Sequence, residues 1–168
     1  MLTGEQVAGL EVDDLVGLST MQMAAMNIQQ LAGFTTDQIP GFSSTQLRAI
    51  ETRDMVAFTT DQMGAFTEAQ VTSLLTGQIA ALNSKQLGAL NADVMSGLSS
   101  LQIKAIEARD IVGLTAAQMT DLTSTQLAAM TSYQIQAMLS DQVAAIEVEA
   151  ITSCLSGTIS GATGASIS

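Results

Sequence analysis

Two nearly identical charged segments hold the residues whose types and spacing suggest chemistry: RAIETRDMV at 48–56 and KAIEARDIV at 104–112. Carboxylates this close together can serve as paired catalytic acids and bases, and their oxygens are the ligands that Ca²⁺ prefers. The dense oxygen donors and the turn glycine of a calcium loop are missing, however. Basic residues inside both segments favour local ion pairs, with the acids facing the positive end of a helix dipole. The candidate interaction residues are Arg48, Glu51, Arg53, Asp54, Lys104, Glu107, Arg109 and Asp110.

The composition argues against an enzyme, a cofactor and a metal site. The chain of 168 residues has no His, and therefore lacks the commonest general base and the commonest metal ligand. Its single Cys excludes an intrachain disulfide and a thiolate zinc site. The formal charge of −11 opposes binding to nucleic acid, because phosphate groups repel so acidic a surface. We expect no catalytic, cofactor-binding or metal-binding residues.

An eight-residue repeat organises the chain and must position the charged segments. Counted from Leu2, blocks such as LTGEQVAG, FTTDQIPG and LTSTQLAA follow one another without a gap, with the consensus L-T-x-x-Q-I-x-A. Positions one and six of each octad are large and apolar, position two is mostly Thr, Ser or Asn, and position five is mostly Gln. We expect nineteen octads over residues 2–153 to form one solenoid, and residues 154–168 to be a degraded tail.

The octad predicts one very short helix per repeat. An unbroken helix fails, because eight steps of about 100° overshoot two turns by about 80° and the apolar stripe would wind around it. Thr followed three residues later by Gln is the capping-box pattern of a helix start, and the apolar residues at positions one and six form a hydrophobic staple. The chain should therefore restart a helix at each octad, and the stubs should stack into an all-α superhelix with an aliphatic interior.

A β-solenoid is the alternative fold. In a strand, position six and the next position one would point to opposite faces, so that one of the two most apolar positions would meet water. On a helix, the same two positions share a face because they are three residues apart. The abundance of Ala, Gln, Met and Leu also suits helices. The helical solenoid would then present a bland surface of Ser, Thr and Gln.

The ends of the chain suggest self-association. Repeat proteins need polar capping units to stay monomeric, and the first octad, LTGEQVAG, is an ordinary one. Head-to-tail contacts of such a solenoid do not close on themselves, so we expect a homo-oligomer that extends into a filament. The first residues, MLTGE, carry no basic region of a signal peptide, and no run of 18 apolar residues predicts a membrane insertion.

Octads such as LTSTQLAA, LSSLQIKA and FTTDQIPG resemble the LTTAQ-type repeats of large acidic bacterial surface proteins, which are described as adhesion or haem-utilisation proteins. The resemblance implies an extracellular or cell-surface location, although a cytoplasmic one stays open. It also implies a structural role as a filament subunit or adhesin stalk. The alternative function is a solenoid scaffold that binds a protein or peptide partner through the two charged segments.

Overall fold

The protein is built from short helices only, as the octad predicts. The computed structural model describes residues 3–146, and these contain fourteen α-helices and three 3₁₀-helices that are described from end to end, further helical residues over 140–146, and no strand, which excludes the β-solenoid. The predicted octads beyond residue 146 and the tail 154–168 lie outside the described residues. The elements are α1 (Gly4–Ala8), α2 (Val12–Leu15), α3 (Thr20–Ala24), α4 (Ile28–Ala32), η1 (Ile39–Gly41), α5 (Ser44–Ala49), η2 (Thr52–Ala57), α6 (Thr60–Ala65), α7 (Glu68–Ser73), α8 (Thr76–Ala80), α9 (Ser84–Ala89), α10 (Val94–Gly97), α11 (Ser100–Ala105), η3 (Ala108–Gly113), α12 (Ala116–Thr120), α13 (Ser124–Ala129) and α14 (Ser132–Gln136).

The predicted capping box starts most of these helices. At α6, the backbone N–H of Thr59 donates to Gln62 Oε1 at 2.8 Å, and the Gln62 N–H donates to the Thr59 hydroxyl at 3.2 Å. The helix ends at Phe66, whose backbone is extended with φ −65° and ψ 134°. Each octad with this pair thus satisfies its own helix start with two reciprocal hydrogen bonds, and its helix ends before the next cap.

Three octads form 3₁₀-helices where the consensus is lost. In η2 and η3, Asp54 and Asp110 replace the Gln of position five, and no side-chain hydrogen bond caps the helix. The helices α2 and α10, whose octads also lack this Gln, are only four residues long. In η1, Pro40 removes a backbone donor and the residues before it form a turn. The sequence analysis predicted a helix in every octad. The structure forms an α-helix of five or six residues only in octads that have both the Gln of position five and a backbone N–H at position seven.

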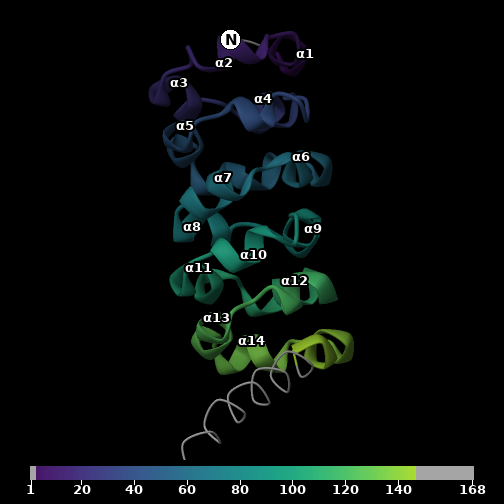
Figure 1. Ribbon diagram of the computed structural model, residues 1–168. Coiled ribbons are helices and arrows are strands. Elements are labelled where there is room, and N and C mark those ends of the chain that lie inside the picture. The colour runs from purple at the N-terminus through teal and green to yellow at the C-terminus, as the bar shows by residue number, and fades with distance from the viewer. Residues whose placement is uncertain (1–2, 147–168) are drawn as a thin grey trace, which may run out of the picture.

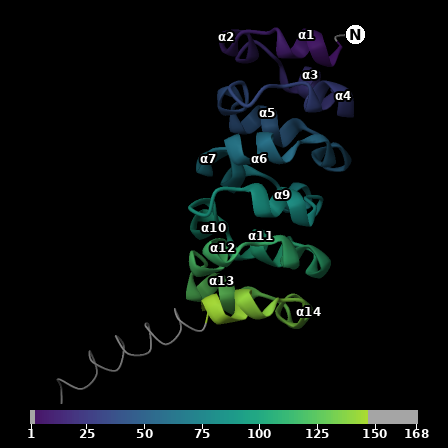
Figure 2. The ribbon, with the colours of Figure 1, turned by 90° about the vertical axis from the view of Figure 1, so that its right-hand side faces the viewer.

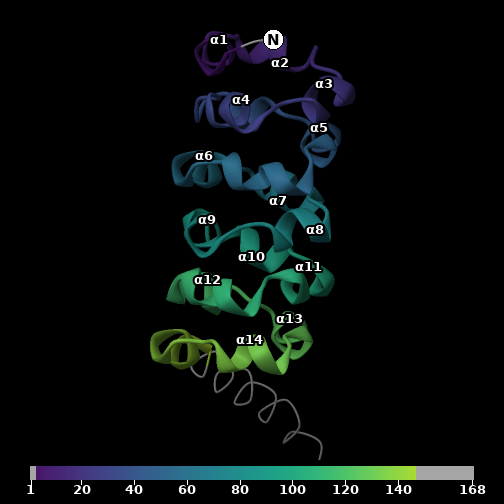
Figure 3. The same cartoon turned by 180° about the vertical axis from the view of Figure 1, so that it is seen from behind.

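Stacking of these helices gives an elongated superhelix, shown in Figures 1 and 3. The helices α4, α6, α9 and α12 run down one side of the ribbon, and α5, α8, α11 and α13 run down the other (Figure 1). Helices in contact, such as α3 with α5 or α6 with α9, begin three octads apart along the chain. One turn of the superhelix therefore takes slightly more than three octads.

The glutamines of position five tie each turn to the one before it. In eleven octads between Gln38 and Gln142, the side-chain Nε2 donates to two backbone carbonyls, 31 and 28 residues earlier, at 2.5–3.4 Å. The earlier of the two carbonyls also accepts the backbone N–H that ends its own helix, as Leu47 does from Ile50, whereas the later one belongs to the residue just past the helix and accepts no backbone N–H in the described structure. We call this set of bonds the glutamine ladder.

The ladder corrects one expectation from the sequence. We predicted Gln as part of a polar surface, but the position-five glutamines from Gln30 to Gln142 are only 0–6% exposed. One amide caps its own helix through Oε1 and a helix of the previous turn through Nε2, and this double use requires burial between the turns. The 28-residue and 31-residue reach also shows that a turn takes fewer than four octads.

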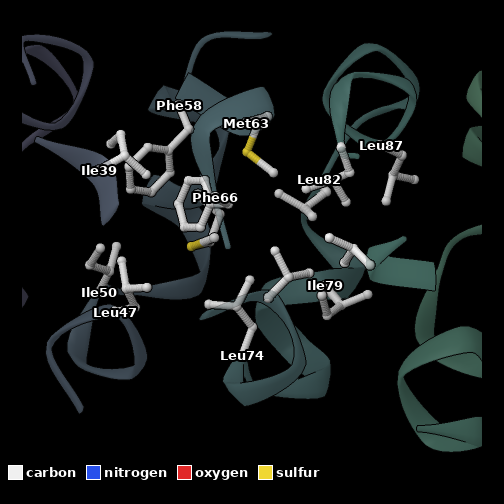
Figure 4. Packing of buried hydrophobic residues seen from close by; sticks show 14 of the residues in the cluster. Ile39, Leu47, Ile50, Phe58, Met63, Phe66, Leu74, Ile79, Leu82 and Leu87 are labelled. Atoms are coloured by element: carbon white, nitrogen blue, oxygen red, sulfur yellow. The ribbon is translucent and has the colours of Figure 1, made fainter. Parts of the chain in front are cut away.

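The core is a continuous apolar column along the superhelix axis (Figure 4). Position six is 0–1% exposed in all octads from Val7 to Met119, and position one is 1–8% exposed from Met26 to Leu122. In the middle of the column, Phe58 and Phe66 pack edge to face with ring centroids 5.2 Å apart. Figure 4 shows side chains of successive turns, such as Leu47, Phe66 and Ile79, converging on this interior. The predicted shared aliphatic interior is confirmed.

Candidate interaction surface

The two charged segments form matching ion-pair clusters. In the first, Arg53 Nη2 lies 2.8 Å from Glu51 Oε2, and Arg53 Nε lies 3.7 Å from Asp54 Oδ2. In the second, Arg109 makes the same contacts with Glu107 at 2.8 Å and with Asp110 at 3.4 Å. Both arginine side chains are more than three-quarters exposed, whereas both aspartates are largely buried. The sequence prediction of local ion pairs is confirmed at both copies.

The superhelix brings both clusters to one side. Arg53 and Arg109 are seven octads apart, which equals twice the 28-residue reach of the glutamine ladder. Seven octads therefore make two turns. One turn is three and a half octads, so a given octad position returns to the same side of the superhelix only after two turns. One hollow of about 530 Å³ is lined by Arg53 and Val56 at one end, by Ala80 and Ala81 in the turn between, and by Arg109 at the other end.

Two further hollows continue along this side of the molecule. One of about 480 Å³ lies between residues 24–29 and the cluster of Glu51, Arg53 and Asp54. The other, of about 490 Å³, is lined by Thr60, Lys85, Gly88 and Val112 among others. The linings of the three hollows combine small or apolar side chains with charged groups.

Arg48 and Lys104, the remaining predicted residues, stand apart from the clusters. They lie in the last turns of α5 and α11 and are exposed, and neither makes an ion pair with any residue in the range 3–146. Each instead faces the negative end of its own short helix.

Sequence reasoning did not predict that Ala80 and Ala81 lie between the two clusters, or that Lys85 lines the adjoining hollow. A signal for both was present, because MAAMNIQQ at 23–30 and IAALNSKQ at 79–86 are a second pair of similar segments, again seven octads apart. The superhelical turn was needed to place these segments beside the clusters.

The clusters differ in one contact. Asp110 Oδ1 accepts a hydrogen bond from the backbone N–H of Ser84 at the start of α9, at 3.0 Å, while Asp54 makes no such bond to any described residue. Gly113 allows η3 to approach α9, because a Cβ at this position would overlap the backbone of Ser84. The equivalent residue of the first cluster is Ala57, which is 7% exposed and carries the Cβ that Gly113 lacks.

Replacing Asp110 with Ala should therefore destabilise the protein more than replacing Asp54 with Ala. Loss of the charged hydrogen bond to Ser84 should lower the free energy of unfolding by about 1.5–3 kcal/mol. The matched change at Asp54 removes only its 3.7 Å ion pair with the exposed Arg53 side chain, and a pair of this kind contributes about 0–1 kcal/mol. Urea unfolding followed by circular dichroism at 222 nm measures both variants. Equal losses would contradict the role given to the Ser84 contact.

The arrangement supports electrostatic recognition. In residues 3–146, no group of three or more Asp, Glu, His or Cys side chains is placed to hold a metal ion. None of the helices in this range has the length and apolar content to cross a bilayer. What the site offers is a row of small apolar floors bordered by guanidinium, ammonium and carboxylate groups.

Comparison with known proteins identifies the repeat. The family model of the ALTTAQ repeat matches residues 7–44 and 103–138, and the second region includes the Arg109 cluster. No curated protein and no solved structure matches the chain. The match concerns the repeat alone and gives no support to a likeness to adhesion or haem-utilisation proteins. The chain is therefore similar, over these two regions, to proteins that contain the ALTTAQ repeat.

Proposed function

We propose that the protein is a structural rod without enzymatic activity, which assembles end to end into filaments or stalks. The observation that carries the proposal is the glutamine ladder. Its bonds always run from a glutamine of one turn to carbonyls of the turn before, so the same bonds can join the first turn of one molecule to the last turn of another. Buried amide–carbonyl pairs and a continuous apolar column make such a rod stiff along its axis.

The first described turn presents unused ladder donors. Gln6 and Gln22 make the cap bond through Oε1 at 2.8 Å, but both are exposed and no carbonyl of a described residue accepts from their Nε2. In this proposal the amides donate to the carbonyls of Leu127, Met130, Ile135 and Met138 of a second molecule, which accept from no glutamine amide of residues 3–146. At that end Ile135 is 47% exposed, whereas the interior residues of position six are covered.

The sequence past residue 146 does not offer the same donors. The ladder positions there are Ala150, Thr158 and Ser166, none of which has a side-chain amide. The N-terminal turn of a second copy therefore matches the chemistry of the C-terminal end better than these residues do. Head-to-tail contact of this kind is heterologous and builds an open filament.

The double variant Gln6→Glu and Gln22→Glu tests the end-to-end joint. Each carboxylate can still accept the cap N–H, but it meets a carbonyl oxygen where an amide donor is needed, so filaments should be lost. Electron microscopy and sedimentation velocity of the full chain measure the effect. The matched control, Gln29→Glu with Gln136→Glu, changes the charge equally at exposed positions outside the ladder and should leave filaments intact. A wild-type protein that stays monomeric at high micromolar concentration would exclude the proposal.

We place the rod outside a bacterial cell on the strength of the octad resemblance alone. Cleavage of the protein by a protease added to intact cells would support this location, and protection from the protease would oppose it.

A scaffold function is the second candidate, favoured by the hollow between Arg53 and Arg109. If a peptide or protein partner binds there, Arg53→Glu with Arg109→Glu should abolish binding in a pull-down while the circular dichroism spectrum stays unchanged. Filament formation should not respond to this variant.

A further inference from the structure

The basic residues of the chain gather on one side of the superhelix. With 28 residues taken as a turn, Arg48 and Arg53 lie in one turn, Lys85 in the next, and Lys104 and Arg109 in the one after. When 28 is subtracted from the residue number for each further turn, all five fall at positions equivalent to 48–57, which is about a third of the circumference. The shared hollow of Arg53 and Arg109, and the adjoining hollow beside Lys85, show this side directly. We call it the cationic side.

Three cations of this side are not neutralised within the described structure. Arg53 and Arg109 are each held by two carboxylates of their own octad. Arg48, Lys85 and Lys104 are exposed and make no ion pair with any residue from 3 to 146. Each of three successive turns therefore presents one unpaired positive charge on the side of the molecule where the hollows lie.

Three exposed acids without cation partners lie on the other side, whereas Asp141 is two 28-residue turns from Lys85 and shares its side. Asp13 is on α2, Glu68 is on α7 and Asp93 precedes α10, and these three helices lie along the same edge of the ribbon in Figure 2. Glu68 lies nearly midway along the chain between Arg53 and Lys85, so it is about half of the 28-residue turn away from each. All three carboxylates are exposed, and none makes an ion pair with a described residue. We call this the acidic side.

We propose that the cationic side of one molecule packs against the acidic side of a second copy, so that superhelices associate laterally in rows. Charge complementarity favours this partner, because each copy carries unpaired cations on one side and unpaired acids on the other. Both kinds of charge are spread along the axis, the cations over about two turns and the acids over about three. Small side chains at the contact, such as Ala80, Ala81 and Gly88, let a second backbone approach closely.

This lateral contact is independent of the end-to-end joint. It uses two different surfaces of each copy, so it does not close and forms an open row. Because the pairs are exposed at the surface, salt should weaken them strongly: the Debye length falls from about 30 Å at 0.01 M to about 3 Å at 1 M ionic strength.

A charge-swap experiment on the full chain tests the proposal. The cationic-side variant carries Arg48→Glu, Lys85→Glu and Lys104→Glu, and the acidic-side variant carries Asp13→Lys, Glu68→Lys and Asp93→Lys. Wild-type protein should show a weight-average mass at least twofold higher at low than at high salt, measured by light scattering. Each variant alone should lose this increase, because its two sides then carry the same sign. An equal mixture should regain it, since the variants can alternate along a row.

Controls separate this contact from the filament joint and from misfolding. Circular dichroism at 222 nm checks that each variant folds. In the Gln6→Glu, Gln22→Glu background, the salt-dependent increase in mass should persist even though filaments are lost. The proposal is overturned if the wild-type mass does not depend on salt, if either variant alone associates like the wild type, or if the mixture stays dispersed. A surface reserved for a peptide or protein of another kind would give the first of these results.

Discussion

Replacing Gln78 with Leu should lower the free energy of unfolding by about 2–6 kcal/mol, because a buried donor or acceptor without a partner costs about 1–3 kcal/mol and two groups lose theirs, the Leu75 N–H and the Ile50 carbonyl. The Gln78 amide is completely buried. Its Oε1 accepts from the Leu75 N–H, and its Nε2 donates to the carbonyls of Leu47 and Ile50. Leu is similar in size, so the change removes the hydrogen bonds while the space stays filled.

The matched control is Gln22→Leu. Gln22 occupies the same octad position and makes the same cap bond to Ser19, but it is exposed and has no carbonyl partner among the described residues. Its loss should lower stability by about 1 kcal/mol or less. Urea unfolding of both variants, followed at 222 nm, compares them directly. If the two losses were the same, the bonds between turns would contribute nothing, and the ladder could not be what joins the superhelix.

Replacing Phe66 with Ala should lower the free energy of unfolding by about 3–5 kcal/mol, the usual range for removing a buried aromatic ring from a packed core. Phe66 is 1% exposed and packs edge to face against Phe58 of the preceding octad. Its removal opens a cavity in the axial core, where side chains of neighbouring turns such as Leu47 and Ile79 lie around it (Figure 4). The surrounding helices are held by the ladder and cannot collapse fully to fill it.

Tyr133 provides the aromatic control for Phe66. It is 76% exposed, so Tyr133→Ala should change stability by no more than about 0.5 kcal/mol. Thermal and urea unfolding of both variants give the comparison. A loss at Phe66 as small as that at Tyr133 would mean that the axial column is not a packed core.

The local structure of each octad could be predicted because its causes lie within a single repeat. The Thr59 and Gln62 pair specifies a helix start by itself, and the apolar residues around it specify which face is buried. The second use of the same glutamine could not be predicted in this way. Gln62 Nε2 bonds to the carbonyls of Leu31 and Phe34, and nothing in the octad indicates which residues lie one turn away.

For the candidate site too, contacts between residues close along the chain could be predicted, and contacts between turns could not. The pairing of Arg53 with Glu51 and of Arg109 with Glu107 follows from their closeness along the chain, and the structure confirms both. Their common side, the floor formed by Ala80 and Ala81, and the contact of Asp110 with Ser84 depend on how far each turn advances. At the second cluster this distance of approach depends on a single Cβ, because a side chain at Gly113 would overlap the backbone of Ser84.

The sequence by itself determined that this chain forms very short capped helices with one apolar face per octad, and that its charged segment recurs after seven octads. The tertiary structure alone decided that seven octads make two turns, and so which charges share a side. The physical reason is the range of the forces involved. Capping and amphipathicity act between near neighbours, whereas closure of the turn results from packing and hydrogen bonds between residues three to four octads apart, where helix spacing depends on every side chain at the contact.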